Sequence, residues 1–291
     1  MRLSTLAPLA AGAFLHGAAA ASASDIAPGD YVAAPPGSNL FLLYLKGATS
    51  GDLHNELAGD VPDSKLDTTV ALLRYVRYEE IAGTPVAVQA IRPVGAIPDV
   101  RIGGANPPTA EGFGDLTLAA TVFPVNTAMT EPYGTSLGAT LYVGTPTGAY
   151  DPGEVSLGSG TWTLTPQIGV TQNLGPGWFF DGALDVAFRL DHTENGDRYA
   201  RDPAWQVQGY LRRNLTDKVS LALGYSGLFG GASSVNGADD GSRTRADQIR
   251  VFGSAFVTPT LQLQAMIGTD LHASGGFRQD LNAELRLLKI F

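Results

Sequence analysis

Side chains that often carry catalysis are few in this chain, and their spacing does not suit a catalytic site. His16 lies in the apolar N-terminal run, and His54, His192 and His272 lie in predicted surface loops. The zinc-protease pattern H-E-x-x-H does not occur, and a barrel lipase would need serine and histidine fixed on neighbouring strands. The sequence therefore predicts a protein that is not an enzyme and that uses no cofactor and no catalytic metal.

An acidic stretch from Asp191 to Asp202 partly resembles a calcium loop. Oxygen ligands occupy its first, third and fifth positions, and Gly196 occupies the sixth. The twelfth position, however, carries the shorter Asp202 in place of the bidentate glutamate, and the flanking segments are predicted strands, not helices. We interpret the stretch as a solvated acidic hairpin loop with weak or no calcium affinity, and Asn236–Gly241 as a similar loop tip.

A larger group of polar side chains recurs at alternate positions along predicted strands. Between Phe180 and Leu190, apolar residues and glycine take most even positions, whereas Asp181, Asp185 and Arg189 take odd ones. Successive strand side chains point to opposite faces, so such a strand has one apolar side and one charged side. The candidates to face the lumen of a barrel are Asp181, Asp185, Arg189, Gln206, Gln208, Arg212, Arg250, Gln262, Gln264, Glu284 and Arg286.

Two interpretations of these inward rows remain open. Charges of both signs on adjacent strands could pair in a network that plugs the barrel, because buried charges must be paired. The same rows could line a polar channel, and in a narrow barrel both could hold. Arg189, near the extracellular end of its strand, is expected to lie close to Gln206 across the following hairpin.

The elements that must position these side chains are strands. Period-two alternation is clear after Phe180 and less clean before it. Short turns such as Gly175–Gly177 and Thr258–Thr260 alternate with long polar stretches such as Thr145–Gly160 and Gly230–Ala246, an asymmetry typical of outer-membrane barrels. The candidate strands of the N-terminal half are Ser38–Gly47, Leu66–Tyr78, Thr84–Val94, Phe113–Pro124, Tyr133–Gly144 and Thr161–Asn173.

The pattern predicts an all-β protein, a closed antiparallel transmembrane β-barrel of about 12 strands of about ten residues each. The alternative is a soluble β-sandwich, but its polar face should then be rich in lysine and glutamate. Here that face carries mainly Gln, Thr, Ser, Gly and charges of mixed sign. An even number of strands puts both ends of the barrel domain on the periplasmic side. The terminal Phe291 is a candidate signal for the barrel assembly machinery.

The N-terminus predicts secretion. Arg2 supplies a positive n-region, the run from Leu3 to Ala21 is largely apolar or small, and Ala21-Ser22-Ala23 is a cleavage site, which together are typical of a signal peptide. We therefore divide the chain into a signal peptide at residues 1–23, a periplasmic N-terminal segment at 24–37 and an outer-membrane barrel at 38–291.

Composition narrows the classes of partner. Glycine accounts for 36 of 291 residues, well above its usual share of about 7%. Charged residues make up 16%, against roughly 25% in typical soluble domains. Cysteine is absent and the formal net charge is -9, so disulfides are excluded and nucleic acid is not expected as a partner. Expected partners are outer-membrane lipid and lipopolysaccharide.

Three glycine-rich motifs resemble those of a known family. Residues Gly112–Leu118 match the pattern GxGDLxL, Thr145–Asp151 contain PTGxYD, and Leu157–Trp162 match LGxGxW. In order and spacing they resemble the transporter-like family named for a putative meta pathway of phenol degradation. The resemblance covers nearly all of the chain after the signal peptide and implies an outer-membrane barrel that moves hydrophobic or aromatic molecules.

The leading hypothesis is therefore a porin-like channel for passive transport of small hydrophobic or aromatic molecules, such as aromatic compound uptake, across the bacterial outer membrane. The alternative is a structural or surface-interaction barrel with a blocked lumen whose acidic loops bind partners. Discrete openings in single-channel recordings would favour the channel, and a folded but silent barrel would favour the alternative.

Overall fold

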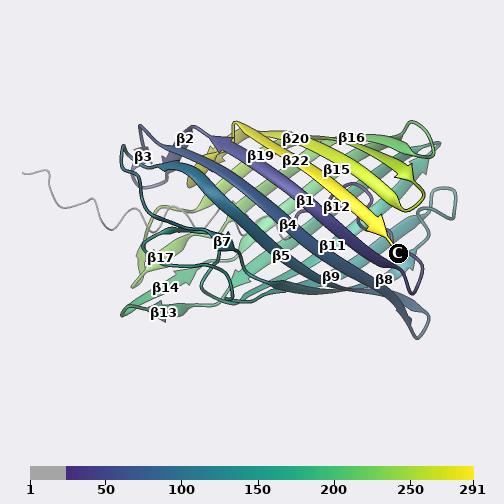
Figure 1. Cartoon of the computed structure of the whole chain (residues 1–291), viewed down its shortest axis with the longest axis horizontal. Coiled ribbons are helices and arrows are strands. Elements are labelled where there is room, and N and C mark those ends of the chain that lie inside the picture. The colour runs from purple at the N-terminus through teal and green to yellow at the C-terminus, as the bar shows by residue number, and fades with distance from the viewer. Residues whose placement is uncertain (1–23) are drawn as a thin grey trace, which may run out of the picture.

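The computed structural model describes residues 24–291, so the predicted signal peptide lies outside the described residues. The main sheet contains 13 strands, of which β7 is appended to β5. The other twelve close into a ring, because β4 pairs with both β1 and β5, and the ring forms a tilted cylinder (Figure 1). The predicted closed antiparallel barrel is confirmed. Among residues 24–291, no helix has the length and hydropathy needed to cross a bilayer.

The twelve barrel strands run antiparallel to their neighbours. Their bounds are β1 Asn39–Ser50, β4 Lys65–Ile81, β5 Thr84–Arg101, β8 Thr117–Asn126, β9 Thr135–Gly144, β11 Thr163–Gly175, β12 Trp178–Arg189, β15 Ala204–Asn214, β16 Val219–Gly230, β19 Thr244–Thr258, β20 Leu261–Ser274 and β22 Leu281–Ile290. The seam is closed by β1 and β22, in a register that runs from Leu40 opposite Ile290 to Thr49 opposite Leu281.

The connections at the two ends of the barrel differ in length. Short turns such as Ala82-Gly83 and Pro176-Gly177 lie at the end that holds the C-terminus, whereas longer connections gather at the other end (Figure 1). The longer connections contain the remaining short strands: β2 Asp52–Asn55, β3 Gly59–Asp60, β6 Thr109–Ala110, β7 Gly112–Phe113, β10 Val155–Ser156, β13 His192–Glu194, β14 Asp197–Arg201, β17 Ser233–Val235, β18 Ala238–Asp239 and β21 Gly276–Arg278. We call the end with the short turns and the C-terminus the periplasmic end, and the end with the longer connections the extracellular end.

Two local expectations were wrong. The single strand predicted over Phe113–Pro124 is divided into β7 and β8, because residues 114–116 leave the barrel ladder. The histidines predicted for loops lie on strands instead: His54 on β2, His192 on β13 and His272 near the outer end of β20. These strands extend into the extracellular connections, where short hairpins replace the expected irregular loops.

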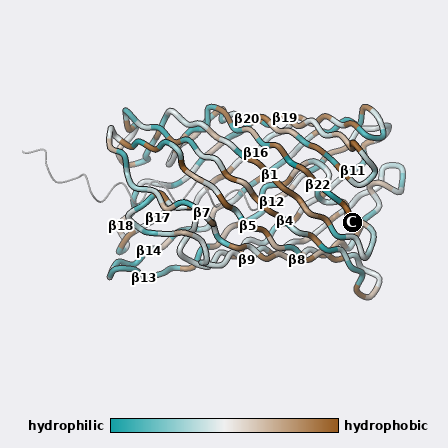
Figure 2. The backbone as a smooth tube through the Cα atoms, viewed as in Figure 1, coloured by the Kyte–Doolittle hydropathy of each residue, from teal (hydrophilic) through white to brown (hydrophobic). Residues whose placement is uncertain are grey.

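The outer surface of the barrel is apolar, as a bilayer requires. On β12, Leu184 is 46% exposed, whereas its neighbour Asp185 is 3% exposed, so the apolar row faces outward and the polar row inward. Figure 2 shows hydrophobic positions recurring along the strands. Aromatic side chains lie on the outward face near both ends, where Trp and Tyr favour the membrane interface: Phe41, Tyr75, Trp178 and Phe291 at one end, and Trp162, Phe188, Trp205 and Tyr225 at the other.

The N-terminal segment is the main departure from the expected organisation. Residues 24–37 were assigned to the periplasm, but the first part of this segment packs inside the barrel. The backbone nitrogen of Ile26 donates to Gln208 Oε1 over 3.1 Å, and that of Ala33 donates to Asn126 Oδ1 over 3.0 Å. At Ala33 the segment has reached the periplasmic end, because Asn126 is the last residue of β8, and Gly37 donates to the carbonyl of Tyr78 near the end of β4. Its polar groups find hydrogen-bond partners on the lumen wall that a free periplasmic tail would lack.

Candidate functional site

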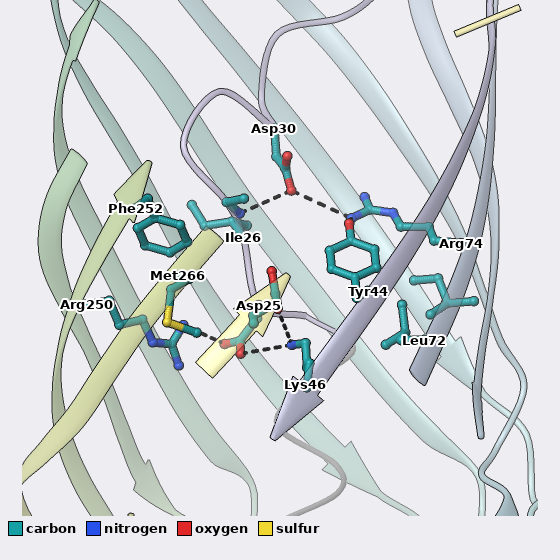
Figure 3. Close-up of a pocket in the computed structure, with 13 residues that line it drawn as sticks. Asp25, Ile26, Asp30, Tyr44, Lys46, Leu72, Arg74, Arg250, Phe252 and Met266 are labelled. Carbon is teal, nitrogen blue, oxygen red and sulfur yellow. Dashed lines mark hydrogen bonds and ion pairs between the residues drawn. The ribbon is translucent and has the colours of Figure 1, made fainter. Parts of the chain in front are cut away.

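The lumen is the candidate functional site, and the N-terminal segment fills its middle. Asp25 lies between two cations: its carboxylate is 3.3 Å from Arg250 Nη1 and 3.9 Å from Lys46 Nζ (Figure 3). Lys46 also contacts Glu284 at 3.0 Å, and Gln206 Nε2 donates to Asp25 over 2.7 Å. The two cations and two carboxylates balance, as charges removed from water require.

Five residues further along, Asp30 makes a second anchor. Its carboxylate lies 2.9 Å from Arg286 Nη1 and 3.6 Å from Arg74 Nη1, and it accepts a hydrogen bond from the backbone nitrogen of Ala27. Arg74 also donates to Gln89 Oε1 over 2.9 Å. Asp30 therefore ties the segment to β4 and β22, on either side of the seam strand β1.

Tyr31 fits the segment against the opposite wall. Its hydroxyl donates to Gln167 Oε1 over 2.7 Å and hydrogen-bonds with Thr140 at 3.0 Å. The ring lies against glycines of β9 and β11, and a Cβ added at Gly138 or Gly169 would come within 2.7 Å or 1.9 Å of it. Only glycine leaves room for this close approach. The two glycines thus form a niche in the barrel wall for the Tyr31 ring.

Most of the polar side chains predicted to face the lumen are buried. Arg189 and Gln262 are half-buried. The others are less than a tenth exposed: Asp181, Asp185, Gln206, Gln208, Arg212, Arg250, Gln264, Glu284 and Arg286. The structure brings most of them into one network with the N-terminal segment. Arg189 instead lies at the outer end of β12, away from it.

The pairing within this network differs from the expected one. Gln206 was expected beside Arg189, but it lies opposite Asp185, because β15 pairs with β12 only as far as Ala187. Asp181 pairs with Arg212 at 2.7 Å, and the Arg212 guanidinium stacks over Phe179 at 4.3 Å. Asp185 accepts from Gln167 Nε2 over 2.8 Å. The nearest acid to Arg250 is Asp25 of the segment.

Sequence reasoning missed the residues that anchor the segment, namely Asp25, Asp30, Tyr31, Lys46 and Arg74. Lys46 could have been identified from the sequence, because it is the only charged residue in β1, a strand that is otherwise largely apolar. A charge on such a strand must face the lumen or find a partner. Asp25 and Asp30 carried no such signal, since their segment has no strand periodicity.

The lumen wall is apolar on one side near the periplasmic end. Across the neighbouring strands β4, β1 and β22, Val76 lies opposite Leu40 and Leu40 opposite Ile290. The next inward row places Leu42 opposite Leu288. A cavity of about 310 Å³ lies against these rows, whereas the space at the level of Asp25 is about 20 Å³. The lumen is thus wider toward the periplasmic end and nearly filled at the level of Asp25.

The three glycine-rich motifs meet at the extracellular end. Asp115, in the first motif, accepts a hydrogen bond from the backbone nitrogen of Gly148, in the second, over 2.8 Å. It also accepts from the backbone nitrogen and the hydroxyl of Ser159, in the third, over 2.7 Å and 2.6 Å. One carboxylate therefore holds the connection 145–162 in its folded shape.

An aromatic cluster joins this connection to the β13–β14 hairpin. The His192 ring stacks on Tyr199 at 5.2 Å, and its Nε2 lies 3.2 Å from the Tyr150 hydroxyl. Burial lowers the pKa of His192 and raises the pKa of Tyr150. The neutral imidazole is therefore favoured, and the protonated tyrosine can donate to it.

Two motif-like stretches have plain structural roles. Residues 134–138 spell G-x-S-x-G, but Ser136 lies on strand β9 with no exposed surface, and its hydroxyl donates to Asn126 Oδ1. A nucleophile elbow needs an exposed serine between a strand and a helix. The stretch from Asp191 forms the hairpin of β13 and β14, with Asn195 and Gly196 at φ 51 and 91 in its turn. Asp191 pairs with Arg198 at 2.7 Å.

Comparison with known proteins adds a family and a fold. The family model described as "Putative MetA-pathway of phenol degradation" matches residues 50–281. No curated protein matches the chain. The chain is similar to a solved outer membrane channel from Pseudomonas putida F1, with 26% identity, a TM-score of 0.82 and coverage of 92% of this chain and 100% of that one.

Two autotransporter domains share the fold more distantly. The transport unit of the autotransporter AIDA-I from Escherichia coli has 11% identity and a TM-score of 0.53, with 92% of this chain and 93% of that chain covered. The beta domain of a Bordetella autotransporter has 10% identity and a TM-score of 0.51, covering 87% and 98%. At these identities the likeness concerns the barrel alone.

Proposed function

Since the chain belongs to the family described as "Putative MetA-pathway of phenol degradation", we propose that it is a channel for passive passage of small hydrophobic or aromatic molecules. The chain is a β-barrel of the bacterial outer membrane, similar over 92% of its length to an outer membrane channel. The family description points to aromatic compounds as cargo. The direction of net movement through a passive channel follows the concentration gradient.

The observation that carries this proposal is the apolar wall inside the barrel. A lumen that served water and ions alone would be lined by polar groups throughout. Here Leu40, Leu42 and Leu288 face inward beside a cavity of about 310 Å³. Contact with such a surface stabilises an apolar solute by roughly 25 cal/mol for each Å² of apolar surface that is removed from water. The wall therefore favours cargo with an apolar body.

In this proposal the N-terminal segment is a movable obstruction. It is held by hydrogen bonds, the ion pairs of Asp25 and Asp30, and the seat of Tyr31, none of which is covalent. Passage requires that part of the segment shift, since the space beside Asp25 is only about 20 Å³. Such a shift would leave the wall strands in place, because the segment adds no strand to the ring.

The same segment also favours the second candidate function. A barrel filled at its middle could be a structural or surface-interaction protein whose long connections bind partners. The network around Asp25 is balanced in charge and well hydrogen-bonded, which suits a permanent plug as well as a gate. Only a measurement of passage separates these two functions.

The test compares three proteins in planar bilayers and in cells. The wild type is compared with the double variant Asp25→Asn/Asp30→Asn, which weakens both anchors, and with Asp52→Asn/Asp63→Asn, whose surface ion pairs lie on the connection 51–64. A channel shows discrete openings, enlarged or more frequent in the first variant only. Cells of a porin-poor strain that carry the protein should also take up labelled phenol faster. Silent, folded barrels in all three cases would establish the blocked barrel instead.

Three further assignments belong to the same proposal. The assembly machinery is proposed to read the C-terminus, where Phe291 is 72% exposed. Lipopolysaccharide is proposed to contact the outward side chains at the extracellular end. The chain is proposed to act without catalysis: its lumen side chains, such as Gln167, Asp181 and Arg212, are engaged with one another.

A further inference from the structure

The periplasmic half of the lumen contains a cavity whose wall combines apolar and cationic side chains. Leu40, Leu42 and Leu288 form its apolar part. Its cationic part includes Arg74, which lies opposite Leu42 on β4, and Arg286, which lies one inward row from Leu288 on β22. Its volume of about 310 Å³ falls at the lower end of the roughly 300–1,000 Å³ found for small-molecule sites. The cavity can therefore hold a small molecule with an apolar body and one polar end.

The charges around this cavity are not balanced. Arg74 and Arg286 share a single carboxylate, that of Asp30, so this group of three carries a net positive charge. The side chains of Arg74 and Arg286 are 13% and 3% exposed. The adjacent group of Asp25, Glu284, Lys46 and Arg250, by contrast, has two charges of each sign. A buried excess of positive charge favours an anion as the missing partner.

Arg286 also has a free donor. Its Nη1 contacts Asp30 and its Nη2 donates to Gln262 Oε1 over 2.9 Å. Its Nε is buried and has no hydrogen-bond partner among residues 24–291. Leaving a buried charged donor unpaired is costly, and a guanidinium suits carboxylate oxygens through parallel hydrogen bonds. The arginine thus retains capacity for an oxygen anion.

We propose that this cavity binds a small aromatic carboxylate of the benzoate class, with its carboxylate on Arg286 and Arg74 and its ring against Leu42 and Leu288. The inference rests on the proposed function, because the bound molecule would be cargo in passage. It narrows the cargo from aromatic molecules in general to those with one negative charge. Arg286 lies one inward row above Leu288 on β22, and Arg74 lies opposite Leu42 on β4, so the groups for the carboxylate and for the ring lie on one wall within two adjacent rows.

The experiment measures binding to the full-length folded protein in detergent by isothermal titration calorimetry. Three probes separate the contributions: benzoate has ring and charge, benzyl alcohol has the ring alone, and acetate has the charge alone. Benzoate should bind saturably, and each of the other two at least about tenfold more weakly, since a charge-assisted hydrogen bond and an apolar ring contact each contribute that much. Equal binding of benzoate and either partial probe would overturn the proposal.

Two variants test the site from opposite directions. Arg286→Gln should weaken benzoate binding about tenfold, whereas Arg245→Gln, a change at an exposed arginine on β19, should leave it unchanged. Folding is checked by heat-dependent mobility in gels. Asp30→Asn removes the competing carboxylate without altering the barrel wall, so benzoate should bind more tightly. Weaker benzoate binding in Asp30→Asn would contradict the site even if Arg286→Gln failed to fold.

The outcome is separable from the proposed function. If benzoate does not bind at this cavity but labelled phenol still enters cells through the protein, the channel stands and the anion site is wrong. If neither binding nor passage is observed, the channel itself is wrong.

Discussion

Asp115 accepts two hydrogen bonds from Ser159, although 44 residues separate them in the chain. One comes from the backbone nitrogen over 2.7 Å and the other from the hydroxyl over 2.6 Å. A third comes from the backbone of Gly148. The aspartate is thus the common point of three glycine-rich motifs that look unrelated along the sequence. It explains why these motifs occur together: the first motif supplies the carboxylate, and the other two lie in the connection 145–162 that this carboxylate holds at the extracellular end.

Replacing Asp115 with alanine should loosen the connection 145–162 while leaving the barrel intact. Three hydrogen bonds to a carboxylate are lost, which we expect to lower the free energy of local opening by about 2–4 kcal/mol. Amide hydrogen exchange of peptides from 145–162 should therefore accelerate. Asp151→Ala is the matched control, because the Asp151 carboxylate accepts a local hydrogen bond from the Gly153 nitrogen, two residues away. Unchanged exchange in Asp115→Ala would remove the carboxylate from this role.

The seat of Tyr31 should be sensitive to a single methyl group. In Gly169→Ala the added Cβ would meet the Tyr31 ring at 1.9 Å, so we expect the N-terminal segment to leave its place. Chymotrypsin added to the folded protein should then cut after Tyr31 several times faster than in the wild type, because Tyr31 is the one aromatic residue between Ser24 and Gly37. Gly253→Ala serves as control, since its nearest neighbour is 3.5 Å away. Equal cleavage in both variants would show that the niche does not hold the segment.

The buried pair of Asp181 and Arg212 should matter more than an exposed one. Arg212→Ala would leave the Asp181 carboxylate without its cation and remove the stacking on Phe179, which we expect to cost about 3–5 kcal/mol of unfolding free energy. Arg245→Ala breaks an exposed pair with Asp247 and should cost at most about 1 kcal/mol. Urea unfolding in lipid vesicles, followed by tryptophan fluorescence, measures both. Similar costs for the two variants would argue against a desolvated pair.

The aromatic cluster at the extracellular end should respond to pH. Burial lowers the pKa of His192 from its usual value of 6.5, so the folded cluster binds fewer protons than the open one. Its stabilisation is therefore complete above pH 6.5 and is lost as pH falls through the lowered pKa. Amide exchange in the β13–β14 hairpin should rise on acidification from pH 7.5 to about pH 5. In His192→Phe this additional rise should disappear, and its persistence would point to another titrating group.

Much of the fold could be predicted because the lipid imposes a simple rule on the sequence. A strand such as β12 must present an unbroken row of apolar side chains to the lipid. In its sequence, Leu184 and Phe188 therefore alternate with the inward-facing Asp185 and Arg189. The alternation weakens in β1, where Leu40 and Leu42 face the lumen. There both faces are apolar, so periodicity alone cannot tell inside from outside.

Of the candidate site, only the side chains of the barrel wall could be predicted from the sequence. The inward rows of β12, β15 and β19 could be read from period two, but what they contact could not. Asp25 meets Arg250 across 225 positions of sequence, and no local pattern encodes so distant a contact. The expected closeness of Arg189 and Gln206 failed for a related reason, since strand register depends on where a hairpin begins, and here β15 starts only at Ala204.

The seam between β1 and β22 also determines how the segment that fills the lumen is held to the barrel. The segment directly precedes β1, and β1 is fixed in the ring by β4 on one side and β22 on the other. The segment is therefore tethered to the wall and stays with the barrel when it is displaced. For the cell, this tether means that a displaced segment returns to the lumen at a high effective concentration, so closing again does not depend on how much protein the membrane contains.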